Sequence, residues 1–242
     1  MNIKIVVLLA RGLRRIVNMK FEIQGTYPVL RCILNQGETI IASAGNMSWM
    51  TEDFTLETSS RGGLLKGFAR AVSGEGMFQN RYTAKRDGQE IAFAASLPGK
   101  IIHMEMQGQQ LLAQKNSFLA STEGVNFEVA LTKKFSAGLL GGEGFVLQRF
   151  SGMGDLFLEA DGSLVDYDLG HGEVLLVDQG HVFMFDESVS YAIETVKGLK
   201  NIVFGGEGAF LVKLTGPGKV VLQTMPISNL AAKIVPFVPS KG

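Results

Sequence analysis

The sequence predicts an all-β protein: a β-sandwich built from three related internal repeats, with little helix. Two observations favour this fold. Short apolar runs separated by glycine-rich turns recur along the 242 residues, and the tripeptide Gly-Glu-Gly occurs three times at nearly regular spacing. A single unit could not bury its own apolar face, so we expect the three units to pack as one cooperative body.

The segment that follows each Gly-Glu-Gly has the same alternation in all three copies. The segments read MFQNRYT from Met77, FVLQRFS from Phe145 and AFLVKLT from Ala209. Each contains a cation, then an apolar residue, then a hydroxyl; the cations are Arg81, Arg149 and Lys213. This alternation predicts a half-buried strand.

A second recurring segment lies upstream of each copy. The three read ETIIASAGNMSWM, QQLLAQKNSFLAS and EVLLVDQGHVFMF, and each has a residue tolerant of a left-handed turn at Gly45, Asn116 or Gly180. We interpret each as a hairpin. Residues 85–97 have no counterpart in the other copies and are predicted to be an inserted hairpin that turns at Asp87-Gly88.

These patterns give the expected domain organisation. One β domain covers 19–242, because no Ser- or Pro-rich linker divides it. Its parts are three repeats and a C-terminal tail, at about 19–97, 98–152, 153–225 and 226–242. Short helical turns are expected at 64–72 and 229–234.

Residues 1–18 stand apart from this pattern. They contain Lys4 and three arginines but no acidic residue, and the recurring strand pattern begins only at Met19. We expect either a short basic leader or a translation start at Met19.

Composition excludes several classes of protein. The 23 Lys and Arg residues balance 23 Asp and Glu residues, which argues against the positive field that nucleic-acid binding requires. The apolar run from Ile5 to Ala10 is far shorter than the ~20 residues that span a bilayer, so no stable membrane anchor is expected. The single cysteine, Cys32, allows no internal disulfide and fits a cytoplasmic protein.

No recognised catalytic or metal-binding spacing occurs in the sequence. Gly-x-Ser-x-Gly, His-Glu-x-x-His, Cys-x-x-Cys and the dinucleotide fingerprint are all missing. His103 is expected on a half-buried strand, His171 at a hairpin entrance and His181 in a turn, and Cys32 is expected to be a buried inert thiol. We therefore predict no catalytic residue, no metal site, no cofactor and no enzyme activity.

Charged residues that recur around the glycines are the candidate site. The glutamates either accept loop hydrogen bonds in tight turns or converge on a cation, and the turn role is favoured. The basic residues nearby either bind a phosphate or an acidic surface, or are simply solvated. The glutamates are Glu75, Glu143 and Glu207, and the cations are Lys66, Arg70, Lys133, Lys134, Lys197 and Lys200.

Apolar residues beside the same glycines form a second candidate surface. Leu64-Leu65, Leu139-Leu140 and Val203-Phe204 are expected to contact sister subunits, and Leu139 and Leu140 are the pair chosen to test this.

The opening segment FEIQGTYPVLRCILNQGE, the threefold pattern and the Gly-Gly-Glu-Gly stretches at 141–144 and 205–208 resemble the "altered inheritance of mitochondria" family. The resemblance covers the chain from about Met19 to its C-terminus, although Ser73 replaces the first glycine in the first copy. It implies a β-sandwich similar to the tryptophan RNA-binding attenuation protein, frequently assembled as a homotrimer. It also implies a link to mitochondrial organisation in fungi, without established catalytic residues.

The leading hypothesis is a cytoplasmic, non-catalytic homo-oligomer, with a trimer favoured, whose glycine-rich loops make subunit contacts or a shared ligand surface. One alternative is a small-molecule-binding protein or enzyme with a sandwich pocket lined by His103 and Glu105. Another is docking to anionic surfaces through the basic loops.

Overall fold

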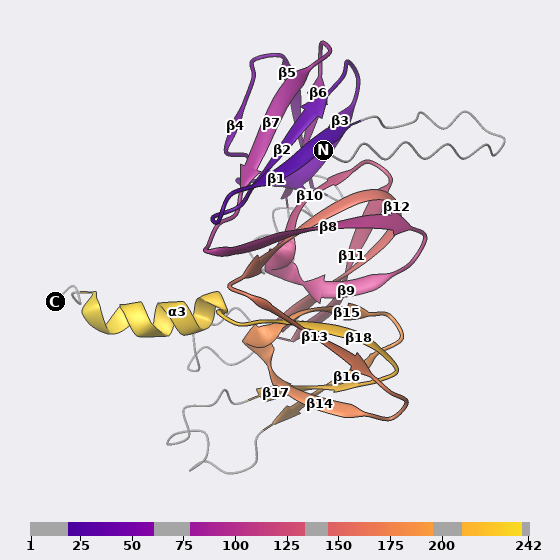
Figure 1. Ribbon diagram of the computed structural model, residues 1–242, viewed down its shortest axis with the longest axis vertical. Helices are drawn as coiled ribbons and strands as arrows, with labels where there is room; N and C mark the ends of the chain where they lie inside the picture. Colours follow the sequence, from indigo (N-terminus) through magenta and orange to yellow (C-terminus); the bar gives the residue numbers. More distant parts are fainter. Residues whose placement is uncertain (1–18, 61–77, 134–144, 196–209, 239–242) are drawn as a thin grey trace.

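A computed structural model confirms the predicted all-β sandwich with little helix. The structure describes residues 19–60, 78–133, 145–195 and 210–238. The chain proceeds along the long axis of the molecule: the strands before residue 95 form one end, those between residues 99 and 161 the middle, and those between residues 164 and 223 the other end (Figure 1).

A four-stranded antiparallel sheet closes the first end. Its spatial order is β1 (Lys20–Gln24), β2 (Val29–Leu34), β7 (Gln89–Ala94) and β4 (Trp49–Met50). The period-two pattern of β2 directs Leu30, Cys32 and Leu34 into the core and leaves Arg31 on the outer face.

The largest sheet runs through the whole molecule. Its order is β13 (Leu164–Leu169), β18 (Gly218–Gln223), β15 (Val182–Asp186), β9 (Leu111–Gln114), β12 (Phe145–Asp161), β10 (Phe118–Thr122), β3 (Thr39–Ser43), β6 (Phe78–Ala84) and β5 (Phe54–Ser60). Two more strands, β8 (Gly99–Gln107) and β11 (Val125–Lys133), pair with β12. The 17-residue strand β12 thus pairs with four others and holds the middle of the molecule together.

A three-stranded sheet closes the second end, in the order β14 (Val174–Asp178), β17 (Phe210–Thr215) and β16 (Ser190–Thr195). Helix is confined to short pieces in the described ranges: η1 (Lys115–Ser117), η2 (Gln179–His181), α3 (Ile227–Ile234) and η3 (Val235–Phe237). The helix predicted at 229–234 lies within α3, whereas 64–72 falls outside the described residues.

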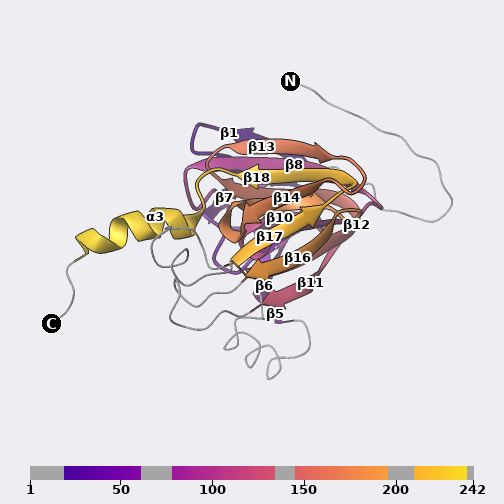
Figure 2. The ribbon, with the colours of Figure 1, turned by 90° about the horizontal axis from the view of Figure 1, so that it is seen from below.

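Helix α3 projects sideways from the body (Figures 1 and 2). The backbone N–H of Ile227 donates to Asp161 Oδ2 at 3.1 Å, which ties the start of α3 to the end of β12. No helix in the described part of the chain has the length and apolar character needed to cross a membrane.

Three clusters of buried apolar side chains follow one another along the molecule. The first packs β2 and β7 of the end sheet onto Phe157 of β12. The second contains Phe118, Phe127 and Phe150, whose ring centroids lie 4.9–5.8 Å apart. The third lies under β14 and β17 and includes Val177 and Leu214. Because each cluster draws on neighbouring thirds of the chain, the core is shared.

The predicted hairpins are wrong, although their strands and turns occur where expected. β9 and β10 flank η1 without pairing to each other, since β9 pairs with β12 and β15 while β10 pairs with β12 and β3. β14 and β15 flank η2 in the same way. Extended residues on both sides of each short 3₁₀ turn carry the chain out of one strand pair and into another.

The hairpin predicted for 85–97 is also wrong, because the strands on its two sides do not pair with each other. Gly88 has φ 72° and makes the expected turn. However, β6 before it pairs with β3 and β5, whereas β7 after it pairs with β2 and β4. The repeat boundary expected after residue 152 falls inside β12, because the strand continues through Gly152.

Candidate functional site

Most residues of the sequence-predicted site fall outside the described residues. These are Glu75, Glu143, Glu207, Lys66, Arg70, Lys134, Lys197, Lys200, Leu139 and Leu140. Lys133 ends β11, where its backbone lies opposite Phe145. Each Gly-Glu-Gly lies, in sequence, between two strands that pair antiparallel: β5 with β6, β11 with β12, and β16 with β17.

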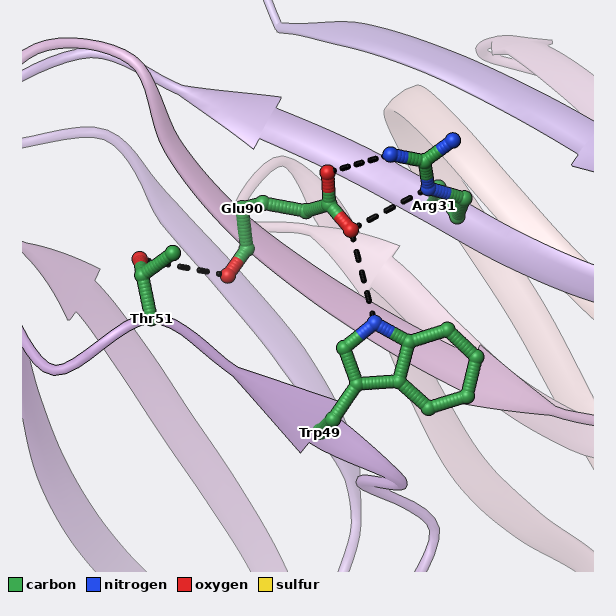
Figure 3. A network of polar contacts seen from close by, with 4 residues as sticks. All are labelled: Arg31, Trp49, Thr51 and Glu90. Atoms are coloured by element: carbon green, nitrogen blue, oxygen red, sulfur yellow. Dashed lines mark hydrogen bonds and ion pairs between the residues drawn. The ribbon is translucent and has the colours of Figure 1, made fainter.

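A polar network on the outer face of the first end sheet was not anticipated from the sequence. Glu90 accepts from Arg31 Nε at 3.1 Å and from Arg31 Nη2 at 2.5 Å (Figure 3). Trp49 Nε1 donates to Glu90 Oε1 at 3.4 Å, and Thr51 Oγ1 donates to the Glu90 carbonyl at 3.4 Å. The hydrogen bonds from Arg31 lower the pKa of Glu90 below its usual value, against the opposing effect of burial.

Strand register brings this network together. Arg31 on β2 and Trp49 on β4 both lie opposite Ala92, the small residue of the strand between them, and Glu90 lies two residues before Ala92 on the same face. The available sequence signal was the alternation of charged and apolar residues in VLRCIL and QEIAFA, together with the only tryptophan of the chain. The pairing of β4 with β7 could not be inferred from that signal.

Two further pairs of polar side chains occupy the same diagonal position on other strands. His103 Nε2 lies 2.7 Å from Asp155 Oδ1 across β8 and β12, and Lys219 Nζ lies 3.1 Å from Asp166 Oδ2 across β18 and β13. The His103 ring also packs on Phe157, at 5.2 Å between centroids, so the half-buried strand position predicted for it is confirmed. Glu105, its proposed companion in a pocket, is exposed on the same strand.

The remaining histidines lie in turns, and the single cysteine lies in the core. His181 ends η2, where Nδ1 donates to the Gln223 carbonyl at 2.8 Å and Nε2 accepts from Asn229 at 3.3 Å. His171 lies in the turn before β14. Burial, assisted by the negative charge of Asp155, raises the pKa of the Cys32 thiol, which keeps it protonated and inert.

Metal ligation has no support in the described ranges of the chain. Within them, His, Cys, Asp and Glu side chains form no group of three or more able to hold a metal ion.

Eight described strands each pair with only one other described strand, and two of them, β4 and β14, lie at opposite ends of the molecule. Among the described strands, β4 pairs only with β7, and β14 pairs only with β17. Trp49 and Met50 on β4 are 48% and 36% exposed, and Val174 and Leu176 on β14 are 47% and 52% exposed. We call β4 with Trp49 and Met50 the head edge, and β14 with Val174 and Leu176 the tail edge. Open edges with apolar side chains are able to accept another strand.

Comparisons with known proteins agree with the fold. A family model described as "Mitochondrial biogenesis AIM24" matches residues 21–225. An uncharacterised protein of Streptococcus pyogenes serotype M6 is 27% identical over 235 residues, which cover 93% of each chain. A crystal structure of a Streptococcus pyogenes protein superposes with a TM-score of 0.74 at 24% identity, over 91% of this chain and 100% of the other.

Proposed function

Given that this chain belongs to the mitochondrial biogenesis family AIM24, we propose that it is a cytoplasmic, non-catalytic, homo-oligomeric binding or scaffold protein, with a trimer as the favoured assembly. One observation carries this proposal: the head edge and the tail edge are open, apolar and at opposite ends of one chain. A chain with two complementary ends can join to further copies of itself.

The proposal includes the three related repeats predicted from the sequence, at about 19–97, 98–152 and 153–225. Corresponding strand pairs support it: β2 with β7, β8 with β12, and β13 with β18. Each pair has one diagonal contact between polar side chains: Arg31–Glu90, His103–Asp155 and Asp166–Lys219. The likeness to the tryptophan RNA-binding attenuation protein stays a prediction, as does a ligand surface formed by the glycine-rich loops.

Light scattering coupled to gel filtration tests the proposal. The expected result is a mass of three chains at micromolar concentration. A purely monomeric protein would remove the proposed function.

A pair of matched variants tests whether the tail edge makes the contact. Leu176→Asp introduces a charge on β14 and should dissociate the assembly, because the buried carboxylate would be unpaired. Val129→Asp, on β11 in the middle of the molecule, is the control, since Val129 is 46% exposed and lies on neither edge. Both variants should keep β-type circular dichroism. Equal dissociation by both would argue against a contact localised at the tail edge.

A further inference from the structure

We propose that copies of the chain join head to tail, with the tail edge of one copy adding antiparallel to the head edge of the next, and with Lys213 of the first copy pairing with Glu52 of the second. This inference rests on the proposed homo-oligomer and names the surfaces that form it. The occupant of each open edge is therefore a second copy of this chain.

The chain already contains two strand pairings of this kind, each between neighbouring thirds of the chain, and we call such a pairing a joint. β10 pairs antiparallel with β3, with Ser121 opposite Ile41. β15 pairs antiparallel with β9, with Phe185 opposite Leu112. Both joints connect neighbouring thirds of the chain, and both are three residue pairs long.

The strand β14 has the same kind of partner strand as β3 and β9 along one edge, but not along the other. Each of the three pairs, on that side, with the strand that follows a Gly-Glu-Gly, and each places an aliphatic residue opposite the recurring cation. The three pairs are Ile41↔Arg81, Leu112↔Arg149 and Leu176↔Lys213. Along the other edge β3 pairs with β10 and β9 pairs with β15, while β14 pairs with no strand in the described part of the chain.

The strand β4 corresponds to β10 and β15 in the same one-sided way. On their shared side these strands place Met50, Ser121 and Phe185 opposite Ile91, Leu156 and Val220, respectively. On the other side β10 meets β3 and β15 meets β9, whereas β4 has no described partner strand. The internal register therefore predicts Met50 of one copy opposite Leu176 of another.

Charge complementarity supports the same register. At the first internal joint Arg81 pairs with Glu123, two residues beyond Ser121. At the second, Arg149 Nε lies 3.0 Å from Oε2 of Glu187, two residues beyond Phe185.

The corresponding charged residues at the two ends of the molecule are Glu52 and Lys213, and both side chains are accessible to a second copy. Glu52 lies two residues beyond Met50; its side chain is 91% exposed, with Arg86 only at 4.0 Å. Lys213 contacts Glu194 of its own hairpin at 3.3 Å and remains 39% exposed. An added strand at β14 would bring Glu52 of the next copy to the exposed side of this lysine.

Charge reversal tests the ion pair. Glu52→Lys and Lys213→Glu each place like charges at the joint, and each should raise the protein concentration of half-dissociation about tenfold. The double variant Glu52→Lys/Lys213→Glu should recover the wild-type mass by light scattering. Glu105→Lys, an exposed reversal on β8 in the middle of the molecule, is the control and should leave the mass unchanged.

Cysteine cross-linking tests the register without relying on charge. In a Cys32→Ala background, which removes the only native cysteine, Met50→Cys combined with Leu176→Cys should form disulfide-linked multimers on oxidation. Met50→Cys with Val174→Cys shifts one partner by two residues on the same strand and should cross-link poorly. A closed ring would stop the cross-linked ladder at three chains.

The outcomes separate the two proposals. A monomeric wild-type protein would refute the homo-oligomer and this joint together. An oligomeric wild type whose mass is insensitive to both single charge reversals, or which cross-links equally well through residues 174 and 176, would overturn the joint and leave the homo-oligomer standing.

Discussion

Two carboxylates illustrate how opposite surroundings give opposite contributions to stability. Glu90 lies beside Arg31, which lowers the pKa of its carboxyl group. Glu159 is half-buried, and burial raises the pKa of its carboxyl group although Ser96 donates to it from the backbone at 2.8 Å and from the hydroxyl at 3.2 Å. The ionised form is favoured by folding in the first case and disfavoured in the second.

Replacing Glu90 should weaken the Trp49 network. Glu90→Gln removes the charge that Arg31 pairs with, and the expected loss is about 1 kcal/mol in the free energy of unfolding, measured by urea denaturation at pH 7. The loss should shrink as the pH falls through the lowered pKa of Glu90, because protonation removes the same charge in the wild type. An unchanged midpoint at pH 7 would mean that Arg31 and Trp49 find equivalent partners in water.

Replacing Glu159 should have the opposite pH dependence. The folded-state pKa of Glu159 is raised, so the carboxyl group ionises more readily in the unfolded chain. The wild-type protein therefore loses stability as the pH rises from the ordinary carboxyl pKa to the raised value. Glu159→Gln does not ionise, and its stability relative to the wild type should therefore increase between about pH 4 and pH 7. Urea denaturation at several pH values measures the difference. A difference that stays constant across this range would contradict the burial argument.

At the scale of single elements, the turns depend on glycines for two separate reasons. Gly88 has φ 72° with open space around the position of a Cβ, so only its backbone conformation favours glycine. Gly124 lies in the turn between β10 and β11. A Cβ atom added there would lie 1.9 Å from the Met153 carbonyl oxygen, so this position has no space for a side chain. The Gly124 carbonyl in turn accepts from the Met153 N–H at 3.0 Å.

The two glycines should respond differently to alanine. Gly88→Ala should cost about 1–2 kcal/mol through its left-handed backbone. Gly124→Ala should cost more, about 3 kcal/mol, because the turn must move away from β12. Thermal or urea unfolding of the two variants gives the comparison, and an equal loss in both would show that the turn at Gly124 shifts easily.

Strand positions were readable from the sequence, whereas strand partners were not. Period-two alternation located β6, β12 and β17, and glycine chemistry located the turn at Gly88. The hairpin assignments were wrong because alternation describes which face of a strand is buried, not which strand lies beside it. The Trp49 network was missed for the same reason, since Arg31, Trp49 and Glu90 meet only through β7.

At the scale of the whole molecule, the three apolar clusters link one third of the chain to the next. Phe157 of β12 belongs to the first cluster, and Val221 of β18 belongs to the second. Residues distant in sequence therefore lose their partners together when any third of the chain opens.

Unfolding should accordingly be one cooperative transition. Trp49 is the only tryptophan and lies at one end of the molecule, so its fluorescence reports on that end while far-UV circular dichroism reports on all strands. The two urea transitions should coincide under conditions that keep the assembly state constant. Separate midpoints would indicate thirds that unfold independently.

The continuity of β12 has a consequence for dissecting this protein into pieces. The first half of β12 pairs with β11 and β9, and the second half pairs with β8 and β10. A backbone cut near Gly152 would leave two fragments that each lack half of this shared strand. Such fragments should regain the fold only by complementation, whereas a nick outside β12 would leave the central strand whole.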